Sequence, residues 1–215
     1  MRTALNTELN ILIGCESSGV VREAFRALGH NATSCDLLPC DDGSTDHIQG
    51  DVMDAIRSGP RWDLIILHPP CTAICASGNR HYGYGMAKYD QRIAAIKWTL
   101  ELYKLAKNRS EHVAMENPVG SLSTMGGIKA SCYVQPYEHG HPESKKTGFW
   151  LHNLPNIQPT NNVKAEFDRL PKHLAHRIHF MGPSPDRWKQ RSKTFSGLAQ
   201  AMAQQWSTFI ELWST

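Results

Sequence analysis

The sequence predicts an α/β protein built on a Rossmann-like, doubly wound and mostly parallel sheet. In the first half of the chain, short apolar runs alternate with amphipathic segments, as parallel strands alternate with the helices that cover them. Small or polar turns follow these runs, at the sheet edge where open α/β folds bind ligands. The 215 residues suffice for a single domain, 1–215, because domains usually take about 100–200 residues.

The composition is that of a globular protein, with 40% hydrophobic and 20% charged residues, which excludes a disordered or collagen-like chain. The formal net charge of +3 is compatible with a nucleic-acid partner but does not require one. No window approaches the roughly 20 apolar residues of a membrane span, so we expect a cytoplasmic protein without membrane contact. The cysteine spacings do not match a structural zinc site, so no metal is expected.

Apolar runs predict four strands in the first half of the chain, at residues 10–13, 32–35, 48–52 and 63–67. A helix is expected over 19–28, where apolar residues recur at helical spacing: Val21, Phe25 and Leu28. Further along, a helix is expected over 90–107, with one apolar face formed by Ile93, Ile96, Leu100 and Tyr103. A strand over 113–115 should follow, and Pro118 should end it.

Beyond residue 120 the pattern weakens until the end of the chain. Short strands are expected at 132–134 and 149–151, and the five prolines within 155–191 predict mostly loop. A final helix over 196–213 is predicted by an apolar stripe of Leu198, Met202, Phe209 and Trp213.

The turn after the first strand is the first candidate site. Its glycines allow close backbone approach to a ligand, and the following helix should present unpaired N–H groups, although a plain structural turn explains the same residues. The turn comprises Gly14, Cys15, Glu16, Ser17, Ser18 and Gly19. Asp36 and Asp51 follow the next two strands, where a carboxylate suits the ribose hydroxyls of a nucleoside cofactor. Asp51 is equally suited to cap a short helix ending at Arg57.

Two further motifs carry the reactive groups. Pro69 and Pro70 stiffen the chain as it leaves a buried strand, and they present the thiol of Cys71 at the crevice as a nucleophile. Glu116 and Asn117 stand before Pro118 at the end of the next predicted strand. A glutamate there should point into the same crevice, so a nucleophile and an acid would face one substrate.

In their order and residue types, these motifs resemble those of the DNA cytosine C5-methyltransferase family. The chain resembles a short, phage-like member of that family. The family has a cofactor turn, two acids, a Pro-Cys nucleophile and a Glu-Asn dipeptide after successive strands, and residues 191–206 are similar to its closing helix. The resemblance implies S-adenosylmethionine as cofactor, held by the turn, Asp36, Asp51, Val52 and Pro69. It implies DNA as substrate, with Cys71 adding to carbon 6 of cytosine while Glu116 engages ring nitrogen 3. To donate a proton there, Glu116 needs a raised pKa, which burial beside the base stacked in the pocket is expected to produce.

The chain departs from that family in its substrate contacts. Pro70 and Asn117 match the family motifs, but the arginine that meets the base carbonyl has no clear counterpart, and the candidates are Arg80, Lys145 and Lys146. Residues 121–190 leave room only for a reduced recognition or insertion region, followed by a C-terminal helix region, 191–215, on the cofactor side. We therefore expect short or relaxed sequence recognition, or a protein partner that supplies it.

Three alternatives remain open. The same chemistry on a free pyrimidine nucleotide would need no recognition domain, and a non-catalytic nucleic-acid or cofactor-binding module could retain the fold. An amino-methyltransferase is disfavoured, because those enzymes carry an aromatic residue where this chain has Cys71.

Overall fold

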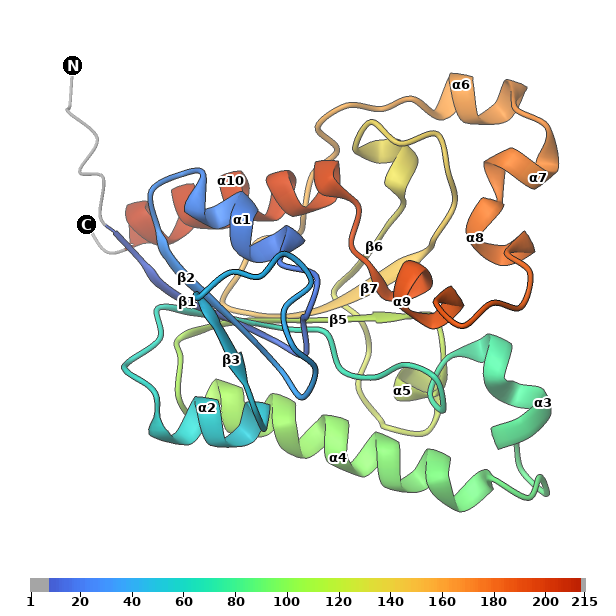
Figure 1. The fold of residues 1–215 in the computed structure, drawn as a ribbon, viewed down its shortest axis with the longest axis horizontal. Helices are drawn as coiled ribbons and strands as arrows, with labels where there is room; N and C mark the ends of the chain where they lie inside the picture. Colours follow the sequence, from blue (N-terminus) through green and yellow to red (C-terminus); the bar gives the residue numbers. More distant parts are fainter. Residues whose placement is uncertain (1–7, 214–215) are drawn as a thin grey trace.

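A computed structural model describes residues 8–213 as one seven-stranded sheet covered by helices on both faces (Figure 1). The strand order is β3-β2-β1-β4-β5-β7-β6, with β7 antiparallel to both neighbours and the other pairs parallel. The strands are β1 (Asn10–Gly14), β2 (Asn31–Asp36), β3 (His47–Gln49), β4 (Leu64–Leu67), β5 (His112–Pro118), β6 (Cys132–Val134) and β7 (Thr147–His152). This mostly parallel, doubly wound sheet confirms the predicted fold class.

The helices are α1 (Val20–Arg26), α2 (Val52–Ser58), α3 (Asn79–Tyr82), α4 (Tyr89–Lys107), α5 (Ser121–Thr124), α6 (Lys164–Arg169), α7 (Lys172–Ala175), α8 (Arg177–Phe180), α9 (Arg187–Ser192) and α10 (Ser196–Trp213). Helices α1 and α10 lie on one face of the sheet, and α2 and α4 lie on the other (Figure 1). Alternate residues of each strand point to opposite faces, so Ile11 and Ile13 pack under α1 and α10, whereas Leu12 packs toward α2 and α4.

Trp206 is the largest fully buried side chain of the core, at 0% exposure. Its indole packs against Phe149 of β7, with ring centroids 5.9 Å apart, and its Nε1 donates a hydrogen bond to the carbonyl oxygen of Pro155 at 3.2 Å. Helix α10 is thereby attached both to the sheet and to the chain that follows β7.

Trp206→Ala is expected to lower the free energy of unfolding by about 3–5 kcal/mol, because it leaves a cavity and an unpaired carbonyl. Urea denaturation followed by circular dichroism measures this change. Trp213→Ala in the same helix is the matched control, since Trp213 is 63% exposed and its loss should cost less than about 1 kcal/mol. Equal losses in the two variants would contradict the placement of Trp206.

Three sequence predictions need correction. The third strand ends at Gln49, and Val52 begins α2 because Asp51 caps that helix. On α4, Ile93 is 43% exposed, and the buried stripe is Arg92, Ile96, Thr99, Leu102 and Ala106. The region 155–191, expected to be mostly loop, contains four short helices, α6 to α9, which are too short to show an apolar periodicity.

Within residues 8–213, no helix has the length and apolar character needed to cross a membrane.

Candidate active site

The ends of β1 and β4 form the centre of the site, because the sheet changes its direction of winding between these two neighbours. Gly14 pairs with Leu67, and the N–H of His68 still donates to the carbonyl oxygen of Gly14 at 2.9 Å. The turn after β1 and the His-Pro-Pro-Cys segment after β4 therefore leave the sheet side by side.

Close packing requires the glycine at position 14. A Cβ there would lie 2.5 Å from Cγ2 of Val52 and 2.9 Å from Cδ2 of Leu67. Val52 itself is 5% exposed and belongs to the core beneath the turn. Val52 thus packs against Gly14, and its contact with a cofactor stays a prediction.

The N-terminus of α1, which follows this turn, is capped by the side chain of Glu16. One carboxylate oxygen of Glu16 accepts hydrogen bonds from the N–H of Val21 at 2.8 Å and the hydroxyl of Ser18 at 3.0 Å, and the other accepts from the N–H of Arg22 at 3.4 Å. Glu16 is only 5% exposed. The expectation of unpaired N–H groups was wrong for Val21 and Arg22, because Glu16 caps α1.

Two residues of this turn have a left-handed backbone conformation. Cys15 has a positive φ of 61° and Gly19 one of 71°. The side chain of Ser17 carries no assigned contact, but its carbonyl oxygen accepts the N–H of Asp41 at 2.9 Å. This bond joins the turn to the loop after β2.

Asp36 and Asp51 both face this turn. Burial raises the pKa of the Cys15 thiol, and the charges of Asp36 and Asp51 raise it further. Burial and the same two acids raise the pKa of Cys35 to about 11. The two carboxylates therefore lie close enough to act on the same two thiols, Cys15 and Cys35.

Each of these acids also has a local structural role. Oδ1 of Asp36 accepts the N–H of Leu38 at 2.9 Å, and Oδ1 of Asp51 accepts the N–H of Met53 at 2.6 Å as the cap of α2. Among the hydrogen bonds of residues 8–213, none involves Oδ2 of either acid. One oxygen of each carboxylate thus accepts no hydrogen bond from residues 8–213.

The diproline is held by the neighbouring strand. Asn117 of β5 is fully buried, and its Nδ2 donates to the carbonyl oxygen of Pro69 at 3.0 Å. Pro69 is buried, Pro70 is exposed and Cys71 is half-buried. Asn117, predicted to contact substrate, instead positions the segment that presents Cys71, because no part of its side chain reaches the surface.

Glu116 lies beside His68 because β4 and β5 are parallel and in register. Leu67 pairs with Met115, so the residues that follow them, His68 just after β4 and Glu116 within β5, lie side by side. Nδ1 of His68 lies 3.1 Å from Oε2 of Glu116, with the two side chains 10% and 12% exposed. His68, assigned no role from the sequence, is thus the nearest polar partner of the predicted acid.

The pKa of Glu116 lies below the usual glutamate value in the protein without substrate. Burial raises this pKa, but the hydrogen bond from His68, the charge of Lys145 and a hydrogen bond from Thr147 lower it and outweigh desolvation. The rise expected when a base stacks beside Glu116 stays a prediction.

Lys145 is the cation shared by the two reactive groups. Its charge lowers the pKa of Glu116 and opposes the rise in the pKa of Cys71, whose own principal causes are a hydrogen bond with Cys75 and burial. Its Nζ donates to the carbonyl oxygens of Ser192 at 3.3 Å and Lys193 at 3.1 Å. A cavity of about 10 Å³, the space of one water molecule, is lined by Glu116, Pro136, Lys145, Thr147, Thr194, Phe195 and Leu198.

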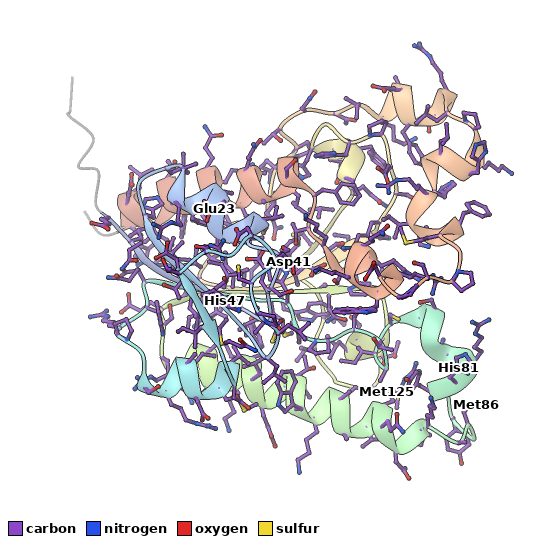
Figure 2. The ribbon with its side chains drawn as sticks, viewed as in Figure 1. Glu23, Asp41, His47, His81, Met86 and Met125 are labelled. Carbon is purple, nitrogen blue, oxygen red and sulfur yellow. The ribbon has the colours of Figure 1, made fainter. Side chains whose placement is uncertain are left out.

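The other two candidates for the base-contacting cation lie elsewhere. Arg80 is exposed on α3, where its Nε donates to the ring of His81 at 3.0 Å, and Figure 2 shows His81 at the outer edge of the molecule. Lys146 is exposed, and its Nζ lies 4.9 Å from the ring centroid of Tyr133. Of the three, only Lys145 acts on both Cys71 and Glu116.

Helix α9, which precedes α10, contacts the loop after β2 through an ion pair. Nζ of Lys189 on α9 lies 2.7 Å from Oδ1 of Asp41, which is labelled in Figure 2. Lys189 is therefore paired with a carboxylate of the protein itself, because the loop after β2 brings Asp41 to it.

Sequence reasoning missed the place of His68 beside Glu116. His68 lies within the segment that contains Cys71, and that closeness was the available signal. In the described part of the chain, no group of three or more His, Cys, Asp or Glu side chains is placed to hold a metal ion.

Comparison with protein-family models and with curated proteins finds no match. Among solved structures, the chain is similar to the methyltransferase EhMeth of Entamoeba histolytica, with 14% identity, 97% of each chain covered and a TM-score of 0.48. It is also similar to WbdD in complex with the kinase inhibitor LY294002, with 13% identity, 68% of this chain and 36% of that chain covered, and a TM-score of 0.41. The S. pombe Dnmt2 methyltransferase is similar at 12% identity, with 84% of this chain and 61% of that chain covered, and a TM-score of 0.41.

Proposed function

We propose that this protein transfers the methyl group of S-adenosylmethionine to carbon 5 of cytosine in DNA, through a covalent adduct on Cys71. The observation that carries the proposal is the placement of a thiol and a carboxylate at the carboxyl ends of the adjacent strands β4 and β5, with Lys145, just before the antiparallel strand β7, lining a cavity with Glu116. Glu116 and Lys145 both act electrostatically on Cys71, although they come from β5 and from the segment before β7.

These three groups match the needs of one planar base. Carbon 5 of cytosine is a weak nucleophile, and addition of the Cys71 sulfur to carbon 6 makes it an enamine carbon. Glu116 would engage ring nitrogen 3, and Lys145 the neighbouring carbonyl oxygen, so that negative charge formed during addition is stabilised. Loss of the carbon 5 proton after methylation then restores the ring and releases Cys71.

Glu116 must be protonated to donate to nitrogen 3, whereas its pKa is low in the protein without substrate. A base that enters the site excludes the remaining water and adds an acceptor for the carboxyl proton. Both changes favour the protonated form, so the pKa of Glu116 should rise when the base is bound.

The turn of residues 14–19 and the free oxygens of Asp36 and Asp51 fit the nucleoside part of the cofactor. A carboxylate after the second strand suits ribose hydroxyls, and Asp51 can accept a hydrogen bond from an adenine amino group. When bound, the cofactor supplies an electrophilic methyl group. Residues 121–190 would form a reduced recognition region, so that duplex cytosine reaches Cys71 only after leaving the base stack.

The decisive experiment is mass spectrometry of nucleosides after incubation with methyl-labelled S-adenosylmethionine. One reaction contains DNA of mixed sequence, and a second contains dCMP at the same cytosine concentration. Labelled 5-methyl-2′-deoxycytidine from DNA supports the proposal. Label only on dCMP would reassign the substrate, label on an exocyclic nitrogen would reassign the reaction, and no label would favour a non-catalytic module.

His68→Ala is expected to raise the pKa of Glu116, because the hydrogen bond from His68 is the largest influence that lowers it. Carbon-13 NMR of labelled glutamate carboxyls measures the titration directly, and the Glu116→Gln variant identifies the signal. His81→Ala is the control, since His81 is exposed on α3 and should leave the titration unchanged. An unchanged midpoint in His68→Ala would contradict the assigned interaction.

A further inference from the structure

Residues 177–193, here called the α8–α9 segment, concentrate the positive charge of the molecule. The segment contains five Lys or Arg residues and a single acid, Asp186, whereas the whole chain has a formal net charge of only +3. The five basic residues are Arg177, Arg187, Lys189, Arg191 and Lys193. The excess of positive charge in this protein therefore comes from this segment, since the remaining residues balance to within one charge.

Two of these cations attach the segment to the rest of the protein. Arg177 donates from Nε and Nη2 to the two carboxylate oxygens of Glu143, at 3.1 Å and 2.9 Å, and Lys189 pairs with Asp41. Within residues 8–213, no ion pair joins a carboxylate to the other three cations, which are Arg187, Arg191 and Lys193. The segment is thus fixed in place while three of its positive charges have no negative partner.

Exposed aromatic rings lie among these charges. Trp188 on α9 is 57% exposed, and Phe180 at the end of α8 is 64% exposed. Nε of Arg187 donates to the carbonyl oxygen of Met181 at 2.9 Å, so the start of α9 is held against the residue that follows Phe180. Aromatic rings next to cations are the groups with which proteins hold unpaired bases and their phosphates.

The C-terminal end of α9 reaches the candidate active site, since Nζ of Lys145 donates to the carbonyl oxygens of Ser192 and Lys193. Lys145 in turn lines the cavity with Glu116. Trp188 precedes Ser192 by four residues, so the two share a face of α9 and lie about 6 Å apart along its axis. Figure 1 shows α8 and α9 at the same end of the molecule as α3. Because stacked nucleotides are about 3.4 Å apart, a base on Trp188 would lie within a few nucleotides of a cytosine beside Glu116.

We propose that the α8–α9 segment binds single-stranded DNA next to the target cytosine, an inference that rests on the proposed methyl transfer. A base near the target stacks on Trp188, and the three cations without a carboxylate partner hold the phosphates. An unpaired cytosine enters the site without the cost of leaving a duplex. Stacking accepts every base, because each has a flat π face, so this surface needs no large recognition domain. The substrate class is DNA whose target cytosine is already unpaired.

The first test measures binding without methyl transfer. The probe is a fluorescein-labelled DNA strand of about 12 nucleotides, used alone or annealed to its complement. The single strand should bind at least about tenfold more tightly than the duplex, because no base pair has to open. Trp188→Ala should weaken single-strand binding at least about fivefold, and Trp188→Phe, which keeps a flat ring, should restore most of it. Trp213→Ala, which removes the exposed tryptophan of α10, should bind normally.

Tryptophan fluorescence reports the stacking directly. Of the six tryptophans in the chain, Trp188 and Trp213 are the exposed ones. Unlabelled single-stranded DNA should quench the emission of the unaltered protein and of Trp213→Ala, because a base lies against the indole of Trp188. The emission of Trp188→Ala should remain nearly unchanged at the same occupancy.

The salt dependence of binding reports the phosphate contacts. Lys193→Ala should lower the slope of log K against log salt by about 0.7, the value for one phosphate contact on a single strand. Lys97→Ala is the matched control, since Lys97 is exposed on α4 and should leave the slope unchanged. An unchanged slope in Lys193→Ala would contradict a phosphate contact of this side chain.

The second test compares methyl transfer to the single strand and to the duplex of the same sequence. The unaltered protein should show a value of kcat/KM at least about tenfold higher for the single strand. Trp188→Ala should raise KM for the single strand at least about fivefold and change kcat less than about twofold, because Trp188 holds a neighbouring base and does not touch the reacting one.

The outcomes separate the two claims. A duplex that binds as tightly as the single strand, or equal binding and quenching in Trp188→Ala and Trp213→Ala, would overturn the role of the α8–α9 segment while methyl transfer stands. Tighter binding of RNA of the same sequence would overturn the assignment to DNA. Binding that depends on Trp188, without methyl transfer to either form of DNA, would instead overturn the proposed function and leave a nucleic-acid-binding module.

Discussion

In the Cys71→Ala variant, methyl transfer to DNA is expected to fall by about 10⁴-fold or more, because the only group that can add to carbon 6 has been removed. Neither Glu116 nor Lys145 can replace it, since both interact with the ring without forming a carbon–sulfur bond. Single-turnover assays with labelled cofactor measure the loss. Folding should be preserved, because Cys71 is half-buried and outside both clusters of the hydrophobic core.

A trapping experiment checks the same step by a covalent product. With DNA that contains 5-fluorocytosine, the fluorine cannot leave as a cation, so the adduct on Cys71 should persist after methyl transfer. The unaltered protein and Cys132→Ala should form a protein–DNA adduct that survives denaturation, whereas Cys71→Ala should form none. An adduct of equal yield in Cys71→Ala would show that another residue is the nucleophile.

Glu116→Gln is expected to lower methyl transfer by about 10²–10⁴-fold, since the amide cannot supply a proton to ring nitrogen 3. Gln can still accept the hydrogen bond from His68 through its amide oxygen, so the buried pair is conserved in shape. The loss should appear in kcat more than in KM, because the proton matters as the adduct forms. Glu143→Gln is a suitable control, as Glu143 pairs with Arg177 on α8. Equal losses in the two variants would contradict the role of Glu116.

The same substitution should change how stability depends on pH. The pKa of Glu116 is lower in the folded protein than its usual value, so the carboxylate stabilises the fold above that usual value, near pH 4.3. This stabilisation is lost as the pH falls through the folded-state pKa. In Glu116→Gln the free energy of unfolding should therefore decline less steeply from pH 5 to pH 3, as measured by urea denaturation.

Local sequence pattern was enough to predict most regular elements. The helix predicted over 196–213 is α10, and the apolar runs after Asn10 and before Pro69 are β1 and β4. Such elements are visible because their apolar residues repeat with the period of the backbone over many residues or form an unbroken buried run. Helices of four to six residues, such as α7 and α9, repeat no period and were predicted as loop.

The sequence by itself determined the fold class and the order in which reactive residues meet the sheet edge, because parallel strands bring their carboxyl ends together. Only the tertiary structure decided which groups touch: His68 with Glu116, Asn117 with Pro69 and Lys145 with the chain before α10. It also decided that Glu16 caps a helix and that the pKa of Glu116 is low. These results depend on strand register and on side-chain contacts between distant segments, which spacing along the chain does not specify.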